Sequence, residues 1–147
     1  MKIQTLPVAH YDDAVALWHD VGLTRPWNAP EADLRTAMSG DSSTVLALLD
    51  GDALLGTAMV GPDGHRGWVY YLAVSPAAQG RGLGRRLMRA CEDWVAAQGI
   101  PKLNLMVRTD NAAVRAFYDR LGYTESEVVV LGRRLDPRSG PEPLQFP

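Results

Sequence analysis

The stretch Gln79-Gly80-Arg81-Gly82-Leu83-Gly84-Arg85-Arg86 decides the architecture of this chain of 147 residues. It lies between the apolar run Trp68–Val74, a predicted strand, and a helical stripe of apolar residues that begins at Leu83. Glycines let the backbone turn tightly and let a ligand approach the amide groups closely. The free N–H groups and the dipole of a helix N-terminus attract anions, and Arg81, Arg85, Arg86 and Arg89 add positive charge. The stretch therefore predicts a site for a phosphate or pyrophosphate.

Two common nucleotide-binding patterns do not fit this loop. The dinucleotide pattern G-x-G-x-x-G requires a third glycine at the position that Arg85 occupies. The pattern G-x-x-x-x-G-K-[ST] fails because no Lys-Ser or Lys-Thr pair follows the glycines. A tight turn between strand and helix with solvent-exposed arginines remains the alternative interpretation.

The rest of the sequence predicts a mixture of helices and strands. Periodicity predicts helices over residues 11–22, 30–38, 83–98 and 111–121, and strands within 1–10, 44–61 (a hairpin), 68–74, 102–107 and 123–135. The hairpin turn is Asp50-Gly51-Asp52, and the strand over 68–74 is apolar on both faces, which predicts cover on each side. This order indicates an α/β or α+β protein with a mixed sheet. We expect one domain over residues 1–135 and a poorly ordered proline-rich tail over 136–147.

Composition and charge exclude several functional classes. Fifteen Lys and Arg against seventeen Asp and Glu give a net charge of -2, so neither nucleic acid nor a membrane is an expected partner. The single cysteine, Cys91, excludes an internal disulfide, and the histidines lack ligand spacing, so no metal site is predicted. The sequence shows neither a signal peptide nor an apolar run of about 20 residues, which predicts a cytoplasmic protein.

Two motifs resemble the GCN5-related N-acetyltransferase (GNAT) family. The signature Q/R-x-x-G-x-G/A is matched by Gln79, Gly82 and Gly84, in the expected context of strand, loop and helix. A second signature, with an Asn that opens a helix and a Tyr near its end, is matched by Asn111 and Tyr118. The likeness extends to about Leu135. More narrowly, the segments RPWN (25–28), DGHRG (63–67) and YYLAV (70–74) are similar to the small bacterial YpeA-type acetyltransferases.

The resemblance implies a fold and a cofactor. The implied fold has a mixed, mostly antiparallel sheet whose parallel central strands splay apart, flanked by about four helices. The implied cofactor is acetyl-CoA, whose pantetheine arm would pair like an added strand with the backbone of Leu72, Ala73 and Val74. Asn111 would reach the pantetheine or the adjoining backbone. The pyrophosphate would rest on the backbone amides of Gln79, Gly80, Arg81, Gly82, Leu83, Gly84 and Arg85.

The implied chemistry is transfer of an acetyl group from a thioester to an amine by direct attack in a ternary complex. A backbone N–H near Leu72 would stabilise the oxyanion, and Tyr118 would protonate the leaving thiolate. Spacing alone makes Tyr118 a plain core aromatic residue, which is the alternative. Many GNATs carry a glutamate on the central strand, but residues 68–74 contain no carboxylate. The general base is therefore unassigned, and a bound water can serve.

The acceptor is the least constrained part of the prediction. Arg25, Trp27 and Asn28 lie in the loop between the first two helices, which lines the acceptor site in this family. Tyr70 and Tyr71 alternate along a strand, so only one of them is expected to face the acceptor. A small-molecule amine and a protein amine both fit, and edge strands near the C-terminus leave a homodimer open. A non-catalytic acyl-CoA-binding module and a generic phosphate-binding domain are the competing hypotheses.

Overall fold

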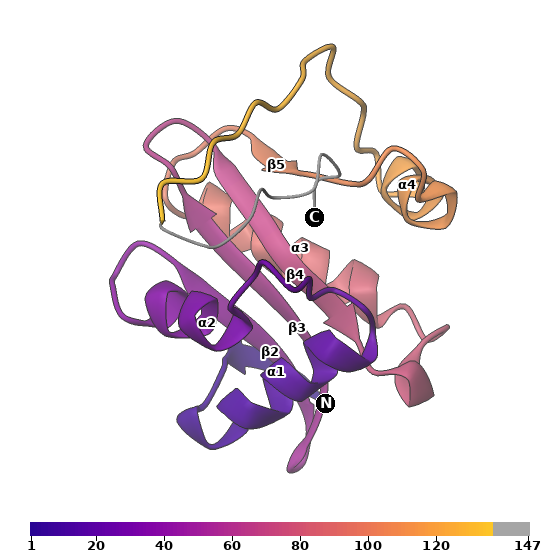
Figure 1. Cartoon of the computed structure of the whole chain (residues 1–147). Helices are drawn as coiled ribbons and strands as arrows, with labels where there is room; N and C mark the ends of the chain where they lie inside the picture. Colours follow the sequence, from indigo (N-terminus) through magenta and orange to yellow (C-terminus); the bar gives the residue numbers. More distant parts are fainter. Residues whose placement is uncertain (137–147) are drawn as a thin grey trace. The chain divides into compact units, whose positions relative to one another are not determined.

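The computed structural model describes residues 1–136, and the chain divides into two compact units, Met1–Met106 and Val107–Pro147. Residues 137–147, which hold most of the predicted tail, lie outside the described part. The second unit contains α4 (Ala112–Arg120). The first unit contains β1 (Lys2–Thr5), η1 (Val8–His10), α1 (Tyr11–Asp20), α2 (Pro30–Met38), β2 (Thr44–Asp50), β3 (Ala53–Pro62), β4 (Gly67–Val74), η2 (Pro76–Ala78), α3 (Leu83–Ala96) and β5 (Leu103–Leu105) (Figure 1).

The five strands form one sheet in the order β1-β2-β3-β4-β5. The first four pair antiparallel, and the predicted hairpin joins β2 to β3 with Gly51 at φ 59°. Strands β4 and β5 are parallel, which requires a crossover connection, and α3 supplies it. The predicted mixed, mostly antiparallel sheet is therefore confirmed.

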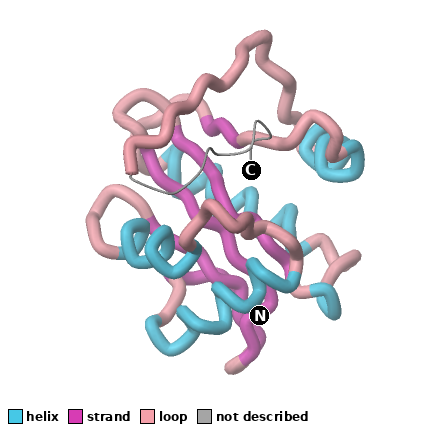
Figure 2. Tube along the Cα trace, viewed as in Figure 1, coloured by secondary structure: helices cyan, strands magenta, loops and turns pink. Residues whose placement is uncertain are grey.

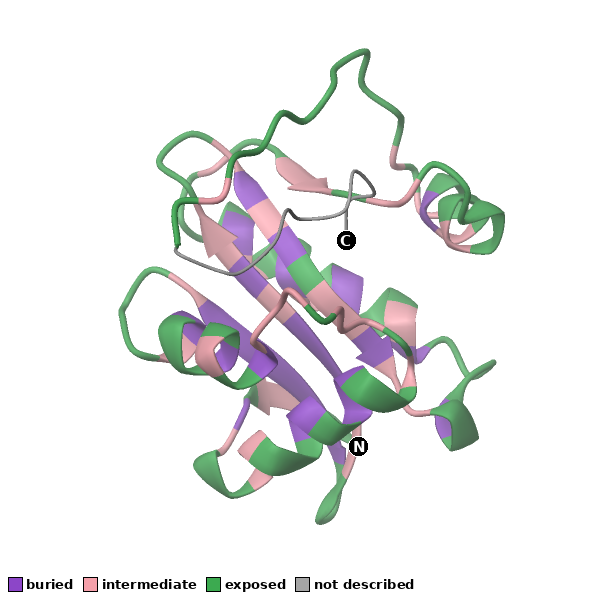
Figure 3. Cartoon of the chain, in the orientation of Figure 1, coloured by how far each residue is buried: buried purple, intermediate pink, exposed green. Residues whose placement is uncertain are grey.

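Helices cover both faces of this sheet. Helices α1 and α2 lie on one face and α3 on the other (Figure 1). Trp18 of α1 is fully buried and packs in one cluster with Val45, Ala47 and Leu49 of β2. On the other face, the apolar stripe of α3 buries Leu83, Leu87, Met88, Cys91 and Val95. Figure 3 shows this burial concentrated on the strands and on the inner sides of the helices. The apolar stripe that begins at Leu83 thus lies on the face of α3 that packs against the sheet.

The central strand is less covered than predicted. Val69 and Ala73 of β4 are buried at 4% and 3% exposure, whereas Tyr70 is 45% exposed. The prediction of cover on both sides is therefore wrong for part of the strand. The neighbouring strand β5 is also shorter than the predicted 102–107, and it pairs only with Gly67–Val69.

The predicted final strand over residues 123–135 is wrong. Residues 123–136 form no helix or strand, and Figure 2 draws this segment as loop. The apolar run that suggested a strand is exposed there, with Val129 at 81% and Leu131 at 89%. A strand is stabilised by its neighbours rather than by intrinsic preference. No partner strand pairs with this run within residues 1–136, so its β-rich composition alone does not produce a strand.

Candidate functional site

The glycine loop, residues 79–85, joins η2 to the first turn of α3. Gly80 and Gly82 have φ angles of 79° and 73°, a left-handed conformation that residues with a Cβ rarely adopt. Gly82 is the N-cap of α3, and no side chain caps the helix. Among residues 1–136, no side chain accepts a hydrogen bond as the N-cap of this first turn, which suits an anionic ligand.

The charges around the glycine loop favour an anion. The first turn of α3 contains no acidic residue. The side chains of Arg81, Arg85, Arg86 and Arg89 are all exposed. Gln79 has a separate task, because its Nε2 donates to the carbonyl oxygen of Val74 at 3.1 Å and ties the loop to the end of β4. The loop thus combines free amides, a helix dipole and cationic side chains.

Within residues 1–136, one edge of β4 has no strand partner in the stretch that leads to this loop. Strand β5 pairs with Gly67, Trp68 and Val69 but with no residue of Tyr70–Val74. The two strands therefore part after Val69, as the resemblance implied. Leu72, Ala73 and Val74 lie on this unpaired stretch, where unsatisfied backbone groups can accept an extended ligand as an added strand.

A β-bulge interrupts β4 at the start of the unpaired stretch. Thr57 of β3 pairs with Ala73 and Met59 pairs with Tyr70, so Tyr71 and Leu72 together stand opposite one residue, Ala58. Tyr71 has φ 51° and is the only non-glycine residue with a positive φ among residues 1–136. Such a conformation costs about 1–3 kcal/mol and persists only where surrounding contacts impose it.

The bulge places both tyrosines on one face, so the expected alternation is wrong. Tyr71 stacks on Trp18, with ring centroids 4.0 Å apart and planes 16° apart. Tyr70 pairs with Met59, and cross-strand partners share a face. Met59 packs against the same cluster that contains Trp18. The extra residue in the bulge shifts the period of two, which explains why both rings face α1 and α2.

Three side chains hold Tyr71 in place, and we call Trp18, Thr57 and Asp33 the Tyr71 clamp. The Trp18 indole N–H donates to Thr57 Oγ1 at 2.8 Å, and Thr57 Oγ1 donates to the carbonyl oxygen of Tyr71 at 3.0 Å. The Tyr71 hydroxyl donates to Asp33 Oδ2 of α2 at 2.7 Å. Burial and the Asp33 carboxylate raise the pKa of Tyr71 above its usual value, so this hydroxyl stays protonated.

The clamp also sets the direction of an amide. No peptide bond within residues 1–136 is cis, and in a trans peptide the C=O and the following N–H point in opposite directions. The Tyr71 carbonyl points to Thr57 of β3. The N–H of Leu72 therefore points away from β3. This is the amide that the resemblance implied as an oxyanion donor.

The loop between α1 and α2 carries the predicted acceptor residues. Arg25 uses Nη1 to donate to the carbonyl oxygens of Gly22 and Thr24, at 2.8 and 2.9 Å, so part of its guanidinium fixes the loop itself. The Asn28 N–H donates to the Arg25 carbonyl at 2.9 Å, and Trp27 is half-buried. These residues lie in the loop as expected, and their role toward an acceptor stays a prediction.

Asp63 organises the turn from β3 into β4. Its Oδ1 accepts from the N–H groups of Arg66 and His65 at 2.7 and 2.8 Å, and its Oδ2 accepts from the Trp68 indole at 2.8 Å. These donors lower the pKa of Asp63 to about 2. The carboxylate also lies near Tyr70, whose pKa is raised mainly by burial and further by this charge.

The second unit contains Asn111 and Tyr118. Asn111 is the N-cap of α4, and its side-chain oxygen accepts from the Val114 N–H at 3.2 Å. Tyr118 is the buried residue of this helix, with its ring edge-on to Phe117 and Tyr123 at 4.9 and 5.7 Å. Asn111 therefore opens the helix as the signature implies. The catalytic role of Tyr118 and the cofactor role of both residues stay predictions.

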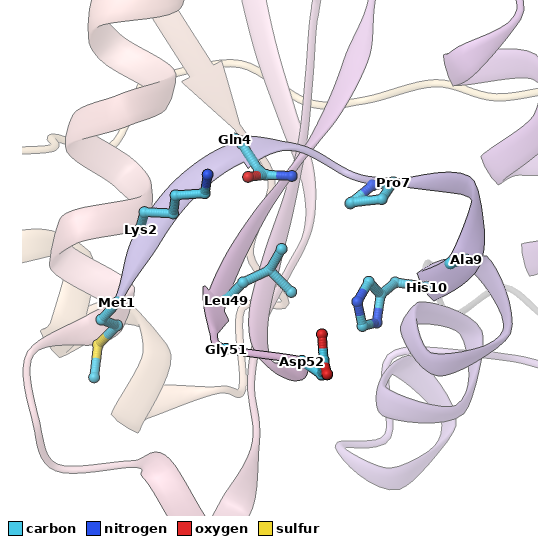
Figure 4. Close-up of a pocket in the computed structure, with 9 residues that line it drawn as sticks. All are labelled: Met1, Lys2, Gln4, Pro7, Ala9, His10, Leu49, Gly51 and Asp52. Atoms are coloured by element: carbon cyan, nitrogen blue, oxygen red, sulfur yellow. The ribbon is translucent and has the colours of Figure 1, made fainter.

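Other candidate sites offer weaker support for a function than β4 and the glycine loop do. Figure 4 shows a surface pocket between β1, η1 and the β2–β3 turn, lined by Met1, Lys2, Gln4, Pro7, Ala9, His10, Leu49, Gly51 and Asp52. It contains no residue of β4 or the glycine loop. Burial raises the pKa of the Cys91 thiol to about 12, which disfavours an acyl-cysteine route. Within residues 1–136, no three His, Cys, Asp or Glu residues group to hold a metal ion, and no helix is long and apolar enough to cross a membrane.

Sequence reasoning missed the Tyr71 clamp. Trp18 lies within the predicted helix over residues 11–22, and Thr57 and Asp33 belong to no recognisable motif. The distances along the chain explain this, because Trp18 and Thr57 are 39 residues apart and Asp33 and Tyr71 are 38 apart. The one local signal was Thr57 itself, a polar residue inside an apolar strand. A buried hydroxyl requires hydrogen-bond partners, which the sequence does not identify.

Comparison with known proteins gives consistent matches over most of the chain. The model of the acetyltransferase (GNAT) family matches residues 12–123. Acetyltransferase YE1169 of Yersinia enterocolitica is 39% identical over 135 residues, which cover 92% of this chain and 96% of that protein. Acetyltransferase YPTB2753 of Yersinia pseudotuberculosis is 38% identical over the same length, with the same shares of each chain covered.

Solved structures agree with the fold. The ribosomal-protein-S18-alanine N-acetyltransferase of Escherichia coli superposes with a TM-score of 0.68 at 26% identity, over 85% of this chain and 78% of that one. The aminoglycoside N-acetyltransferase AAC(6')-Iy, in complex with the bisubstrate analogue CoA-S-monomethyl-acetylneamine, gives a TM-score of 0.77 at 18% identity, over 90% of this chain and 97% of that one. The family match over most of the chain, together with the glycine loop and the divided β4–β5 pair, shows that this chain belongs to the acetyltransferase (GNAT) family.

Proposed function

We propose that this acetyl-CoA-dependent acyltransferase transfers the acetyl group to a primary amine of a small molecule or a protein, by direct attack in a ternary complex. The observation that carries the proposal is the bulged, unpaired stretch of β4 beside the uncapped glycine loop. Together they offer backbone groups that can bind both the pantetheine arm and the diphosphate of acetyl-CoA. Bound acetyl-CoA supplies the thioester, and the residues of the chain position it.

The glycine loop binds the diphosphate. The amides of residues 79–85 donate to its oxygens, and the dipole of α3 and the exposed arginines favour its negative charge. Leu72, Ala73 and Val74 pair with the amide groups of the pantetheine arm along the unpaired edge of β4. The Val74 carbonyl already accepts a hydrogen bond from Gln79. The N–H of Val74 is therefore more available to the pantetheine arm than its carbonyl is.

The N–H of Leu72 stabilises the oxyanion that develops on the acetyl carbonyl. It is directed away from β3 by the Tyr71–Thr57 hydrogen bond, toward the side on which β4 has no strand neighbour. A preorganised donor of this kind lowers the barrier because no solvent has to reorganise during the reaction.

Tyr118 acts as the general acid toward the leaving thiolate. A tyrosine hydroxyl has an ordinary pKa of about 10 and a thiol has one of about 8.5, so a protonated tyrosine can donate to a thiolate at neutral pH. Asn111 contributes to the cofactor site from the start of the same helix, α4.

The acceptor approaches the face of β4 that carries Tyr70 and Tyr71. Tyr70 is 45% exposed on this face. Arg25, Trp27 and Asn28 contribute to acceptor binding from the loop between α1 and α2, as the resemblance implies. The attacking amine must be neutral, although an ordinary lysine-type ammonium has a pKa of about 10.4. A bound water relays its proton, since β4 carries no carboxylate.

The test is a screen of amine acceptors with detection of released thiol, followed by kinetics of Tyr118→Phe. We expect the variant to lower kcat by about 100-fold while the KM for acetyl-CoA stays nearly constant. Tyr123→Phe is the matched control, because it removes a neighbouring hydroxyl and should leave kcat almost unchanged. Unchanged kcat for Tyr118→Phe would exclude the general-acid role. Calorimetric binding of acetyl-CoA without thiol release from any acceptor would instead favour a non-catalytic acyl-CoA-binding module.

A further inference from the structure

The Tyr71 clamp contains a hydrogen-bond chain whose direction is fixed. An indole N–H can only donate, so the Trp18–Thr57 contact of 2.8 Å uses Thr57 Oγ1 as the acceptor. A hydroxyl has one proton, and the other partner of Thr57 is the Tyr71 carbonyl at 3.0 Å, which can only accept. The proton of Thr57 therefore points to Tyr71. Trp18 and Thr57 are both fully buried, so water does not compete for these positions.

The hydrogen bonds from Trp18 through Thr57 fix the orientation of one peptide plane. The Thr57 hydroxyl holds the C=O of the Tyr71–Leu72 peptide, and the N–H of the same plane belongs to Leu72. If that carbonyl loses its donor, the plane is free to rotate about the neighbouring bonds, and the N–H rotates with it. The strained φ of 51° at Tyr71 adds to this tendency, because a residue with a Cβ relaxes out of the left-handed region when it can.

The ring of Tyr71 has contacts in addition to those of its backbone. It stacks on Trp18 at 4.0 Å between centroids, and its hydroxyl donates to Asp33 Oδ2 at 2.7 Å. Asp33 belongs to α2, whereas Thr57 belongs to β3, so two separate elements fix the same residue. A plain packing contact would not require a hydrogen bond at each end of Tyr71.

We propose that Thr57 is a positioning residue for the acetyl transfer, which acts through the Tyr71–Leu72 peptide by aiming the Leu72 N–H at the acetyl carbonyl. Trp18 orients the Thr57 hydroxyl, and Asp33 holds the Tyr71 ring so that the bulge persists. The inference rests on the proposed function, since it assigns the Thr57 hydroxyl to the same oxyanion donor.

The inference predicts different effects on the affinities for acetyl-CoA and for CoA. The Leu72 N–H donates to the acetyl carbonyl, a group that CoA lacks. The glycine loop binds the diphosphate, which both ligands contain. Thr57→Val removes the hydroxyl and keeps the shape of the side chain. We expect Thr57→Val to weaken acetyl-CoA binding by roughly 5-fold, the effect of one hydrogen bond, and to leave CoA binding unchanged. Its kcat should fall by about 10-fold to 100-fold, because the donor matters most in the transition state.

The experiment measures the affinities for acetyl-CoA and CoA by calorimetry, and kcat and KM, for the wild type, Thr57→Val and Thr57→Ser. Thr57→Ser keeps the hydroxyl and should restore both the preference for acetyl-CoA and kcat. Equal loss of affinity for both ligands in Thr57→Val, or unchanged kcat and affinities, would overturn the inference. Failure of the wild type to bind either ligand would instead overturn the proposed function.

A second variant covers the case in which Thr57→Val does not fold. Tyr71→Phe removes the bond to Asp33 from a half-buried position and keeps the stacked ring. It should lower kcat and the affinity for acetyl-CoA in the same direction as Thr57→Val, by a smaller factor, without changing CoA binding. Wild-type values for all of these quantities would contradict the positioning role of the clamp.

Discussion

The glycine loop and the bulge of β4 reach the same unusual backbone conformation by different means. Gly80 and Gly82 have φ angles of 79° and 73°, and a Cβ at either position would meet no atom within 4 Å. Their conformation therefore needs no support from neighbouring side chains, because glycine adopts it at little cost. Tyr71 has φ 51° and carries a large side chain, so its conformation has to be imposed by contacts.

The difference shows how a site can combine local and distant control. The glycine loop depends on residue types within one short segment. The bulge depends on Trp18, Thr57 and Asp33, which come from three different elements. We therefore expect the loop to be sensitive to changes within it, and the bulge to be sensitive to changes far away in the sequence. Four predictions test this contrast, in decreasing order of the change that we expect.

Trp18→Ala should have the largest effect, because it removes the stacked partner of Tyr71 and empties a fully buried position. Truncation of such a residue lowers the free energy of unfolding by about 3–5 kcal/mol. Urea denaturation followed by the fluorescence of the remaining tryptophans measures it. Trp94→Ala on α3, where Trp94 is only half-buried, is the control and should cost less. Equal losses for both variants would contradict the expectation that burial and clamp contacts together make Trp18 the more important of the two.

Gly82→Val should weaken the glycine loop. A β-branched residue at φ 73° costs about 1–3 kcal/mol, so the loop relaxes and CoA affinity falls roughly 10-fold to 100-fold. Calorimetry with CoA measures the change. Gly82→Asn is the matched control, since asparagine tolerates the left-handed region, and it should retain most of the affinity. If Gly82→Val bound CoA as well as the wild type, the conformation of the loop would not matter for binding.

Tyr71→Gly and Tyr71→Ala compare the two routes directly. Both remove the ring, but only glycine also removes the cost of the left-handed conformation, about 1–2 kcal/mol. After the entropic cost of glycine, about 0.5–1 kcal/mol, Tyr71→Gly should be more stable than Tyr71→Ala by roughly 0.5–1 kcal/mol in urea denaturation. The control Ala53→Gly, at an exposed strand position, should show the ordinary opposite sign. The idea of a strained bulge fails if Tyr71→Ala proves the more stable of the two.

Asp63→Asn should have the smallest effect on stability, and this effect should appear only at acidic pH. The pKa of Asp63 is lowered to about 2 in the folded protein from an ordinary 3.8, so its contribution to stability is present above about pH 4 and is lost as the pH falls toward 2. The urea midpoint of the wild type should therefore decline more steeply between pH 5 and 2 than that of the variant. Asp52→Asn, which changes the same charge in the exposed β2–β3 turn, is the control. Identical slopes for the wild type and Asp63→Asn would contradict the assignment of this pKa.

Local patterns predicted much of the fold. The hairpin around Gly51, the helices α1, α2 and α3 and the N-cap at Asn111 all follow from residue types within a few positions of one another. The run Val128–Leu131 shows the limit of such patterns. Its composition predicts a strand, yet within residues 1–136 it pairs with none, because a strand requires a neighbour that composition does not supply.

Residue types within one short segment account for the glycine loop, because its positive φ angles, the amides of a helix N-terminus and the nearby arginines are all local properties. The bulge of β4, in contrast, depends on contacts that form only in the folded protein. That bulge turns Tyr70 and Tyr71 to one face and aims the Leu72 N–H away from β3. The physical reason is that the left-handed conformation of Tyr71 is unfavourable in isolation. It exists only where Trp18, Thr57 and Asp33, brought together by folding, offset its cost.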